Sequence, residues 1–500
     1  MLIVMIFTLV TFLVGCTTKS ENTSSEESSA ATERSYTDFI DSGKIIAVQT
    51  GSVHGIVAED ILKGTAQEFS NPNEMFVSLR NGRVDAVLLD SDYLKPFIDS
   101  GQYPEFEFFF VPEDVFLNRA APIFHTEELR DKYNEWLAIV SADGTRDEII
   151  ARWIGVSLPN EEDVPFIDLQ GGNGTLRVAD TFDYPPFIYY NSQGLPTGLD
   201  YEMTSRFAEH LGMNLEPLSM SYEAVLVSVK SGKVDMSACL YTVTEERSEN
   251  IIFGDPFIYN QVIIVALKEN APQTEESTNF IAWLKNGIEN NLITDNRWKM
   301  IVDGLGVTLI IALGSQIFGT ILGCLICFLL GRKSRIARGF GRLYCNLING
   351  IPVVVLLMVI YYIVFGNSTI SNVFVAIVAF SMVVAANVAK TLDGAIKTVD
   401  PVEIEAARSI GFSAMRAFRL VTLPQAVKRA LPGYVSGFVE LVKATAIVGF
   451  IAIQDLTRAA DIIRSRTYDA FFPLILIAVI YLIVTAVIIL IFKRITKNVS

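Results

Sequence analysis

Hydrophobic positions are distributed unevenly along this chain. Residues 1–300 mix short apolar runs with polar and acidic segments, whereas the remainder consists mostly of long stretches with few charges. A helix needs about 20 mainly apolar residues to cross a bilayer. The pattern predicts five membrane-spanning helices, at residues 301–330, 343–366, 372–396, 433–453 and 471–492.

The earlier part has the pattern of an α/β fold. Short apolar runs bounded by Gly and Asp are typical of buried parallel strands, and helix-period segments such as 202–211 and 224–230 lie between them. The predicted strands include residues 45–48, 86–89, 176–179 and 262–266. We therefore expect an α/β domain that precedes an all-α membrane domain.

Polar segments divide the chain further. A Ser/Thr/Glu-rich stretch behind the apolar N-terminus predicts a disordered tether, and Pro159, Pro165 and Gly171-Gly172 indicate a linker. The predicted segments are a signal or anchor at 1–16, the tether at 17–35, two pieces of the α/β domain at 36–155 and 175–268, linkers at 156–174 and 269–300, and the membrane domain at 301–492.

Composition excludes some classes of function. Hydrophobic residues make up 51% of the 500 residues, too many for a soluble protein of this length. The net charge of −15, from 40 Lys and Arg against 55 Asp and Glu, argues against a nucleic-acid partner, because phosphate binding needs a basic surplus. Cys324 and Cys327 have a metal or redox spacing, but no second ligand pair accompanies them and the chain holds three histidines. We expect no metal and no cofactor.

Basic residues predict the orientation of the membrane domain. The segment 331–342 carries Arg332, Lys333, Arg335, Arg338 and Arg342. The positive-inside rule places this segment in the cytoplasm. Alternation of the spans then puts residues 1–300 outside the membrane and residues 397–432 inside.

One stretch of the predicted cytoplasmic segment has a distinctive sequence, EAARSIGFSAMRAFRLVTLP at residues 405–424. It resembles the EAA loop of bacterial ABC importer permeases in residue types and spacing, with Val421 in place of the family's isoleucine. The matching residues are Glu405, Ala406, Ala407, Gly411, Leu423 and Pro424. The resemblance implies that the loop, residues 401–424, docks on cytoplasmic ABC ATPase subunits.

The loop also predicts its own local structure. Pro401 fits the first turn of a helix, because its missing N–H has no partner there. Gly411 can adopt the left-handed geometry that ends a helix, so a short helix is expected over 401–409. The chain has no G-x-x-x-x-G-K-[ST] motif. We therefore expect a transport subunit that is not itself an enzyme.

Residues 297–492 resemble, throughout, the permease subunit of polar amino acid importers. Such permeases work in pairs, which implies a second permease copy, as a homodimer or with a related subunit. Lys390 and Asp393 exchange the signs of the family's Glu–Arg pair in the third span, and at this spacing they can still pair on a helix. Charges inside a span are costly and usually functional, which suggests that both residues lie on the translocation path. The alternative is that Lys390 lies near the cytoplasmic end and reaches the lipid headgroups.

Two blocks of the α/β part resemble the lobes of family 3 solute-binding proteins for polar amino acids. The first-lobe motifs are Tyr184–Phe187, Gly198–Glu202, Ser231–Asp235, Thr242–Arg247 and Phe253–Phe257. The second-lobe motifs, with the closing segment, are Ala47–Ser52, Gly82–Val87, Asp90, Asp143–Thr145 and Arg152–Gly155. The resemblance implies a bilobed periplasmic-binding-protein-like domain of type II.

The order of these blocks is inverted, since the second-lobe motifs come first in the chain. A circular permutation explains this order, with the linker 156–174 joining the former ends, because the termini of compact domains usually lie close together. The alternative is a pair of halves left from two truncated domains. Each motif occurs once, which favours the permutation.

An α-amino acid needs a cation for its carboxylate and an anion for its ammonium. By the resemblance, Arg247 binds the carboxylate through two parallel hydrogen bonds, and Asp90, with Asp92 as a competitor, accepts from the ammonium. The other implied ligand-binding residues are Thr242, Thr244 and Ser52 as donors, with Tyr184 and Tyr222 as aromatic walls. Leu240 replaces a glycine of the family, which would narrow the pocket.

The N-terminus resembles a lipobox, with Leu13-Val14-Gly15-Cys16 behind an apolar run. The resemblance implies that Cys16 is lipidated and anchors the chain in membrane lipid. No Lys or Arg precedes the apolar run, as signal peptides expect. An uncleaved anchor or a misassigned start is therefore an open alternative.

These patterns together predict a subunit of an ABC importer for a polar amino acid, in a bacterial cell membrane with the binding domain outside. A ligand-gated channel is the alternative, because the same bilobed domain caps ionotropic receptors. Such channels lack an EAA loop and carry a re-entrant pore segment, which the sequence does not indicate. An enzyme is a third hypothesis, and no nucleophile–base pair supports it.

Overall fold

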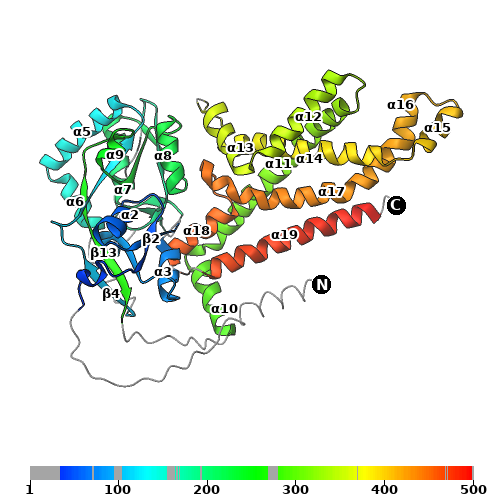
Figure 1. Cartoon of the computed structure of the whole chain (residues 1–500). Helices are drawn as coiled ribbons and strands as arrows, with labels where there is room; N and C mark the ends of the chain where they lie inside the picture. The colour runs from blue at the N-terminus through cyan, green and yellow to red at the C-terminus, as the bar shows by residue number, and fades with distance from the viewer. Residues whose placement is uncertain are drawn as a thin grey trace.

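The computed structural model of the chain has an α/β part followed by a helical part (Figure 1). It describes residues 34–69, 72–94, 104–154, 164, 167, 169, 171–191, 194–268, 280–366, 368, 370–467, 469 and 471–497. Cys16, the predicted anchor and the predicted tether up to residue 33 lie outside these residues, as do most of the two predicted linkers up to residue 279.

One half of the α/β part, the β1 lobe, is a mixed sheet in the strand order β2-β1-β3-β13-β4. Its strands are β1 (Ile45–Gln49), β2 (Thr65–Phe69), β3 (Ala86–Asp90), β4 (Phe106–Phe110) and the end of β13 (Ile258–Leu267). β1 runs parallel to β2 and β3, as the buried apolar runs predict. The helices α2 (His54–Ile56) and α3 (Pro72–Arg80) belong to this lobe.

The other half, the β6 lobe, has the strand order β10-β6-β11-β5-β13. Its strands are β5 (Leu117–Phe124), β6 (Thr175–Asp180), β10 (Asn214–Ser219), β11 (Met236–Thr242), β12 (Ile252–Phe253) and the beginning of β13. Its helices are α5 (Glu127–Ala142), α6 (Thr145–Trp153), α7 (Leu199–Leu211), α8 (Tyr222–Lys230) and α9 (Glu245–Ser248).

The two lobes share strands across the inverted sequence blocks. β5 comes from the earlier block, yet it pairs with β11 and β13 of the later block, for example Ala121 with Tyr241 and Ala120 with Ile258. β13 starts in the β6 lobe and ends between β3 and β4 of the β1 lobe. Each block therefore depends on the other to complete its sheet.

Helices of the earlier block also complete the core of the β6 lobe. Tyr133 and Trp136 of α5 pack on Phe207 of α7, with ring centroids 5.2 and 5.4 Å away. Trp153 at the end of α6 is fully buried, and its indole N–H donates to Glu202 of α7 at 2.8 Å. Buried aromatic rings contribute much of the apolar area that stabilises a core, so these contacts bind the two blocks together.

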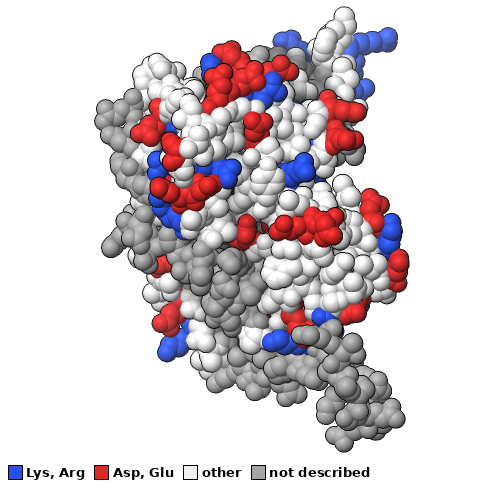
Figure 2. Space-filling model, turned by 90° about the vertical axis from the view of Figure 1, so that its left-hand side faces the viewer, with Lys and Arg blue, Asp and Glu red and all other residues white. Residues whose placement is uncertain are grey.

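Acidic and basic side chains are interspersed on the outer face of the α/β part (Figure 2). No large basic patch is visible on this face. The view agrees with the net charge of −15.

Four helices of the described part are long and apolar enough to cross a membrane, or five spans result if one bent pair counts as a span. The helices that make up these spans are α11 (Trp298–Leu330), α14 (Asn372–Lys397), α16 (Ala414–Ala417) continuing into α17 (Leu423–Ala444), and α19 (Phe472–Lys497). The helical fold class is therefore confirmed.

The predicted second span, 343–366, is not one straight helix. α12 (Arg335–Gly350) and α13 (Val353–Val359, continuing to Val364) meet at 105°. The break falls at Ile351, whose backbone is extended with φ −103° and ψ 130°, because the ring of Pro352 disfavours a helical residue before it. α12 also contains most of the predicted basic loop 331–342, which is helical from Arg335.

α11 and α14 approach each other closely in the helical part. A methyl group on Gly319 of α11 would lie 2.5 Å from Cβ of Val384 in α14. Small residues of this kind let the backbones of membrane helices pack together. α15 (Pro401–Ser409) and α16 lie at the end of the helical part that is far from the α/β part (Figure 1).

Candidate functional site

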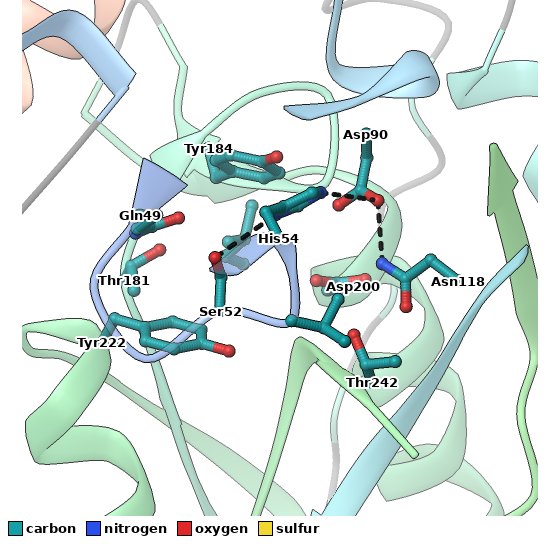
Figure 3. Close-up of a pocket in the computed structure, with 12 residues that line it drawn as sticks. Gln49, Ser52, His54, Asp90, Asn118, Thr181, Tyr184, Asp200, Tyr222 and Thr242 are labelled. Atoms are coloured by element: carbon teal, nitrogen blue, oxygen red, sulfur yellow. Dashed lines mark hydrogen bonds and ion pairs between the residues drawn. The ribbon is translucent and has the colours of Figure 1, made fainter. Parts of the chain in front are cut away.

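A cavity of about 30 Å³ lies between the two lobes of the α/β part. The residues that line it are Gln49, Ser52, Val53, His54, Asp90, Asn118, Thr181, Tyr184, Ile188, Asp200, Tyr222 and Thr242 (Figure 3). This volume suits water rather than an amino acid. The lobes must therefore move apart before a ligand of that size can bind.

Asp90 carries the negative charge on the β1-lobe side of the cavity. It ends strand β3 and is 4% exposed. The side-chain amide of Asn118 donates to Asp90 Oδ1 at 2.8 Å, and His54 Nε2 lies 3.6 Å from the same oxygen (Figure 3). The imidazole Nδ1 of His54 is 3.3 Å from Ser52 Oγ, so His54 connects Ser52 with Asp90. A carboxylate in this place can accept hydrogen bonds from an ammonium group.

Aromatic rings form the walls of the cavity on the β6-lobe side. Tyr184 stacks on Tyr93, with ring centroids 4.3 Å apart. Tyr222 stacks on Tyr241 at 4.8 Å, and the Tyr241 hydroxyl donates to the backbone carbonyl of Tyr222 at 2.9 Å. The faces of such rings attract cations.

Arg247 and Thr244 do not line the cavity. The guanidinium of Arg247 donates to the carbonyl of Gly51 in the β1 lobe at 2.6 Å and to the carbonyl of Thr242 at 3.4 Å. Thr244 is the N-cap of α9, where its hydroxyl accepts from the backbone N–H of Arg247. Arg247 therefore connects the two lobes beside the cavity. Of the predicted ligand-binding residues, the structure brings Ser52, Asp90, Tyr184, Tyr222 and Thr242 together.

Asp200 is a cavity residue that the sequence analysis missed. The residue is 1% exposed, and within the described part of the chain neither of its carboxyl oxygens has a hydrogen-bond partner. Burial, followed by the neighbouring Asp180, raises the pKa of Asp200 well above its usual value. A protonated carboxyl group in this position offers a ligand one O–H donor as well as an acceptor.

Other cavity residues were missed as well, and the sequence held a signal for only some of them. Thr181 directly follows strand β6, and ligands of α/β folds bind at the carboxyl ends of parallel strands. His54 lies two positions after Ser52. Asn118 had no such signal, since it enters the cavity only because β5 pairs with strands from the other block.

The helical part contains a second cavity of about 150 Å³. Its lining includes Asn387 and Thr391 of α14 together with Tyr434 and Glu440 of α17. Neither residue of the predicted translocation pair, Lys390 and Asp393, lines this cavity.

The predicted pairing within α14 also differs. Asp393 forms an ion pair with Lys397 at 2.5 Å, and no ion pair between Lys390 and Asp393 is found among the described residues. Spacings of three and four both bring side chains together on a helix. Lys397 lies at the exposed C-terminal end of α14, and its amine reaches the carboxylate of Asp393. Asp393 therefore pairs with the lysine four residues after it and not with Lys390, three residues before it.

The EAA segment has the predicted local structure. α15 spans Pro401–Ser409, with Asp400 as its N-cap, and Gly411 follows with φ +94°. The predicted short helix over residues 401–409 is thus confirmed. Within the motif Ala407 is buried, whereas Glu405 and Ala406 are exposed.

Apolar side chains are also exposed around this segment. They include Val402, Ile410, Met415, Leu420, Leu423 and Val427. Met415, Leu420, Leu423 and Val427 belong to a helix that is long and apolar enough to cross a membrane, whereas Val402 and Ile410 precede it.

Two groups of predicted residues gain no structural description. Cys16 lies outside the described residues, and the surroundings of the Leu240 side chain are not described. Cys324 and Cys327 are free thiols on α11. Within the described residues, no cluster of three His, Cys, Asp or Glu side chains suits a metal ion.

Comparison with known proteins agrees with this architecture. The model of the family 3 bacterial extracellular solute-binding proteins matches residues 176–304. The model of the binding-protein-dependent transport system inner membrane component matches residues 300–500. The first match therefore covers the later block of the α/β part, and the second covers the helical part.

Individual relatives align with the helical part. The chain is 33% identical over 202 residues to the putative glutamine transport system permease protein GlnP of Rickettsia conorii, covering 40% of this chain and 92% of that protein. It is 31% identical over 195 residues to the probable amino-acid ABC transporter permease protein YckA of Bacillus subtilis, covering 39% and 86%. A solved amino acid ABC transporter with histidines is 30% identical, with a TM-score of 0.39, over 44% of this chain and 99% of that chain.

The fold, the cavity and the EAA segment define a membrane transport subunit that carries its own ligand-binding domain. The chain belongs to the family of binding-protein-dependent transport system inner membrane components, with a family 3 solute-binding domain fused to the permease domain.

Proposed function

We propose that this chain captures an amino acid outside the membrane and passes it through its own permease domain. The observation that carries the proposal is the cavity between the lobes, where a buried carboxylate, hydroxyl groups and aromatic rings converge. Relatives of the permease domain include a histidine/lysine/arginine/ornithine transport system permease protein of Salmonella typhimurium, at 29% identity over 40% of this chain and 94% of that protein.

In this proposal each end of the ligand has a chemical partner. Asp90 accepts from the α-ammonium, with Asn118 and His54 holding the carboxylate in place. The hydroxyl groups of Thr242 and Ser52 donate to the carboxylate of the ligand when the lobes close. Arg247 adds positive charge beside them and holds the lobes together through the carbonyl of Gly51. Tyr184 and Tyr222 enclose the ligand between their rings.

The α/β part is proposed to be one circularly permuted domain, residues 36–155 and 175–268. The exchange of β5 and β13 between the two blocks supports this, because neither sheet is complete without the other block. Two truncated halves would need no such exchange. The domain is proposed to lie outside the membrane, opposite the basic helix α12 and the EAA segment.

Transport further requires partners. We propose that cytoplasmic ABC ATPase subunits bind the exposed surface of α15 and α16, and that two permease domains form the path. Apolar side chains of α11 such as Ile310, Ile317 and Leu325 are exposed and suit contact with lipid. Lipidation of Cys16 remains a proposal for an additional anchor.

Ligand screening of the full-length chain tests this function. The purified protein in detergent is heated with the standard L-amino acids one at a time, and with their deaminated analogues as matched controls. At least one amino acid should raise the unfolding temperature through binding to the folded state, and its analogue should have a smaller effect. If no amino acid changes the unfolding temperature, the proposed capture of amino acids is wrong.

One feature favours a second candidate, a ligand-gated channel. The 105° bend between α12 and α13 has the shape of a broken span or a re-entrant segment. Current across a planar bilayer that contains the chain without any ATPase separates the two functions. An importer subunit should give no amino-acid-dependent current.

A further inference from the structure

Helix α18 (Leu456–Thr467) lies between the α/β part and the helices of the permease domain (Figure 1). It contacts α11 and α19 on the permease side. It also carries two arginines, Arg458 and Arg464, that reach the two different lobes of the binding domain. One short helix therefore contacts both lobes of the binding domain.

Arg458 anchors the β6 lobe. Its guanidinium lies 3.3 Å from Asp183 Oδ2 and 3.3 Å from Ser219 Oγ, and donates to the carbonyls of Thr181 and Met220. The residue is 8% exposed. Hydrogen bonds from a guanidinium are charge-assisted and stronger than those between neutral groups. We therefore expect Arg458 to hold the β6 lobe strongly to α18.

A second group of contacts holds the same lobe. Lys233 donates from Nζ to the carbonyls of Phe365 and Ser368, at 2.9 and 3.2 Å. Ser228 Oγ and the Tyr362 hydroxyl are 3.0 Å apart. Tyr362, Phe365 and Ser368 lie in or directly after the continuation of α13 and are far from α18 along the chain. The β6 lobe therefore contacts the permease domain at two separate places.

The β1 lobe makes a weaker contact with α18. Glu74 of α3 lies 3.8 Å from Arg464 Nη2, and the Glu74 side chain is 39% exposed. A partly exposed ion pair of this length adds little stability. Arg464 also has an alternative partner on its own helix, since Asp461 is 3.2 Å away. Arg464 can therefore release Glu74 without being left unpaired.

A movement of α18 has a direct route into the spans. The hydroxyl of Thr308 in α11 accepts from the backbone N–H of Leu456 at 3.2 Å. A methyl group on Gly304 would lie 2.7 Å from the carbonyl oxygen of Asp455, so the backbones of α11 and the start of α18 are in close contact. α11 in turn packs along α14.

We propose that α18 senses closure of the binding domain, with the β6 lobe as the fixed anchor and the β1 lobe as the moving part. With the lobes close together, as here, Glu74 and Asp461 pair with different nitrogens of Arg464. Opening of the lobes removes the Glu74 contact and leaves Asp461, and closure on a ligand restores the Glu74 contact. The contact favours the arrangement of α18 and α11 that belongs to the liganded state. This inference rests on the proposed import function, because it needs a ligand that closes the lobes.

A charge exchange tests the pair in the full-length chain, reconstituted in lipid vesicles with its ATPase subunits and a mixture of the standard L-amino acids as the probe. Glu74→Arg and Arg464→Glu should each lower the amino-acid stimulation of ATP hydrolysis by roughly 2- to 5-fold, the range of a weak coupling contact. Basal hydrolysis and amino-acid binding should stay near wild type. The double variant should restore the stimulation.

Glu128→Arg is the matched control, because Glu128 pairs with Lys132 on the exposed surface of α5 and should leave the stimulation unchanged. Glu74→Gln serves as a second variant that removes only the charge at a partly exposed position, and should also lower the stimulation.

Full stimulation in Glu74→Gln and Glu74→Arg, or a double variant no better than the single ones, would overturn the proposal. Binding and stimulation by the wild-type chain are measured in the same assay. If the wild type neither binds nor responds to amino acids, the import function itself fails and this inference fails with it. A wild-type response with unaffected variants overturns this inference alone.

Discussion

Arg458 and Asp183 are separated by 275 positions in the sequence, yet the guanidinium of Arg458 lies 3.3 Å from Asp183 Oδ2. Asp183 directly precedes Tyr184, which lines the cavity between the lobes, and Arg458 belongs to the permease domain. The binding domain therefore contacts the permease domain next to the cavity, through a buried arginine and a partly exposed aspartate.

The first prediction concerns the charged ends of the ligand. Asp90→Asn keeps the shape of the side chain but removes the charge that would accept an ammonium. We expect binding to weaken by roughly 2–5 kcal/mol, as for other buried charge pairs that lose one partner, and more for amino acids than for their deaminated analogues. Titration calorimetry measures both. Asp114→Asn, at an exposed position, is the control; equal affinity in Asp90→Asn and the control would contradict the assignment.

Arg247 extends the same prediction. Arg247→Ala should also weaken binding by roughly 2–5 kcal/mol if its guanidinium reaches the ligand carboxylate. Comparing each amino acid with its decarboxylated amine separates two roles. A larger loss for the amino acid indicates direct contact with the carboxylate, whereas an equal loss indicates that Arg247 acts by joining the lobes through Gly51. Unchanged affinity for both compounds excludes both roles.

The second prediction is that the two sequence blocks of the binding domain do not fold separately. Residues 36–155 and 175–268, produced as separate chains, should lack cooperative thermal unfolding, because β5 and β13 each complete a sheet of the other block. The joined segment 36–268 is the control and should unfold cooperatively. Circular dichroism measures all three. A full cooperative transition in each separate block would show that the permuted-domain proposal is wrong.

The third prediction concerns coupling to the ATPase. Gly411→Asp places a charge in the exposed turn after α15, where the φ of +94° also strains any residue with a side chain. We expect ligand-stimulated ATP hydrolysis in vesicles to be abolished while ligand binding by the same variant is unchanged. Gly339→Asp is a matched control, since Gly339 is an exposed glycine of α12 with open space around it. Normal stimulation in Gly411→Asp would mean that the EAA segment does not couple to an ATPase.

The fourth prediction follows from the pKa of Asp455, which precedes α18. Burial raises this pKa from 3.8 to about 6. Because the folded pKa lies above the unfolded one, the folded chain binds the proton more tightly. The stability that the group contributes is complete below about pH 4 and is lost as the pH rises through 6.

Asp455→Asn should therefore stabilise the folded chain above pH 6 by up to ~3 kcal/mol, the free energy of a shift of about two pKa units. Asn also keeps an acceptor for the backbone N–H of Arg458, which Asp455 binds at 3.0 Å. Thermal unfolding in detergent between pH 4 and 8 measures the difference. A benefit that persists unchanged at pH 4 would contradict the titration of this carboxyl group.

The sequence alone determined the class of this protein, because the signals are local. Hydrophobic runs of membrane length report the spans directly, and Pro401 and Gly411 specify the ends of α15 through their own backbone limits. The strands 45–48, 86–89 and 176–179 were likewise evident from runs of apolar residues. The residues Asp90, Tyr184, Thr242, Ser52 and Tyr222 followed from motifs, and the structure gathers them around one cavity.

The tertiary structure decided what depends on contacts between distant segments. Asn118 enters the cavity because β5 crosses into the other lobe, and no local pattern reports that pairing. Arg247 lies beside the cavity because its guanidinium finds the Gly51 carbonyl across the lobes. The contact of Arg458 with Asp183 depends on the packing of one domain on the other. Local sequence limits the backbone through sterics, whereas such contacts are selected only when the whole chain is folded.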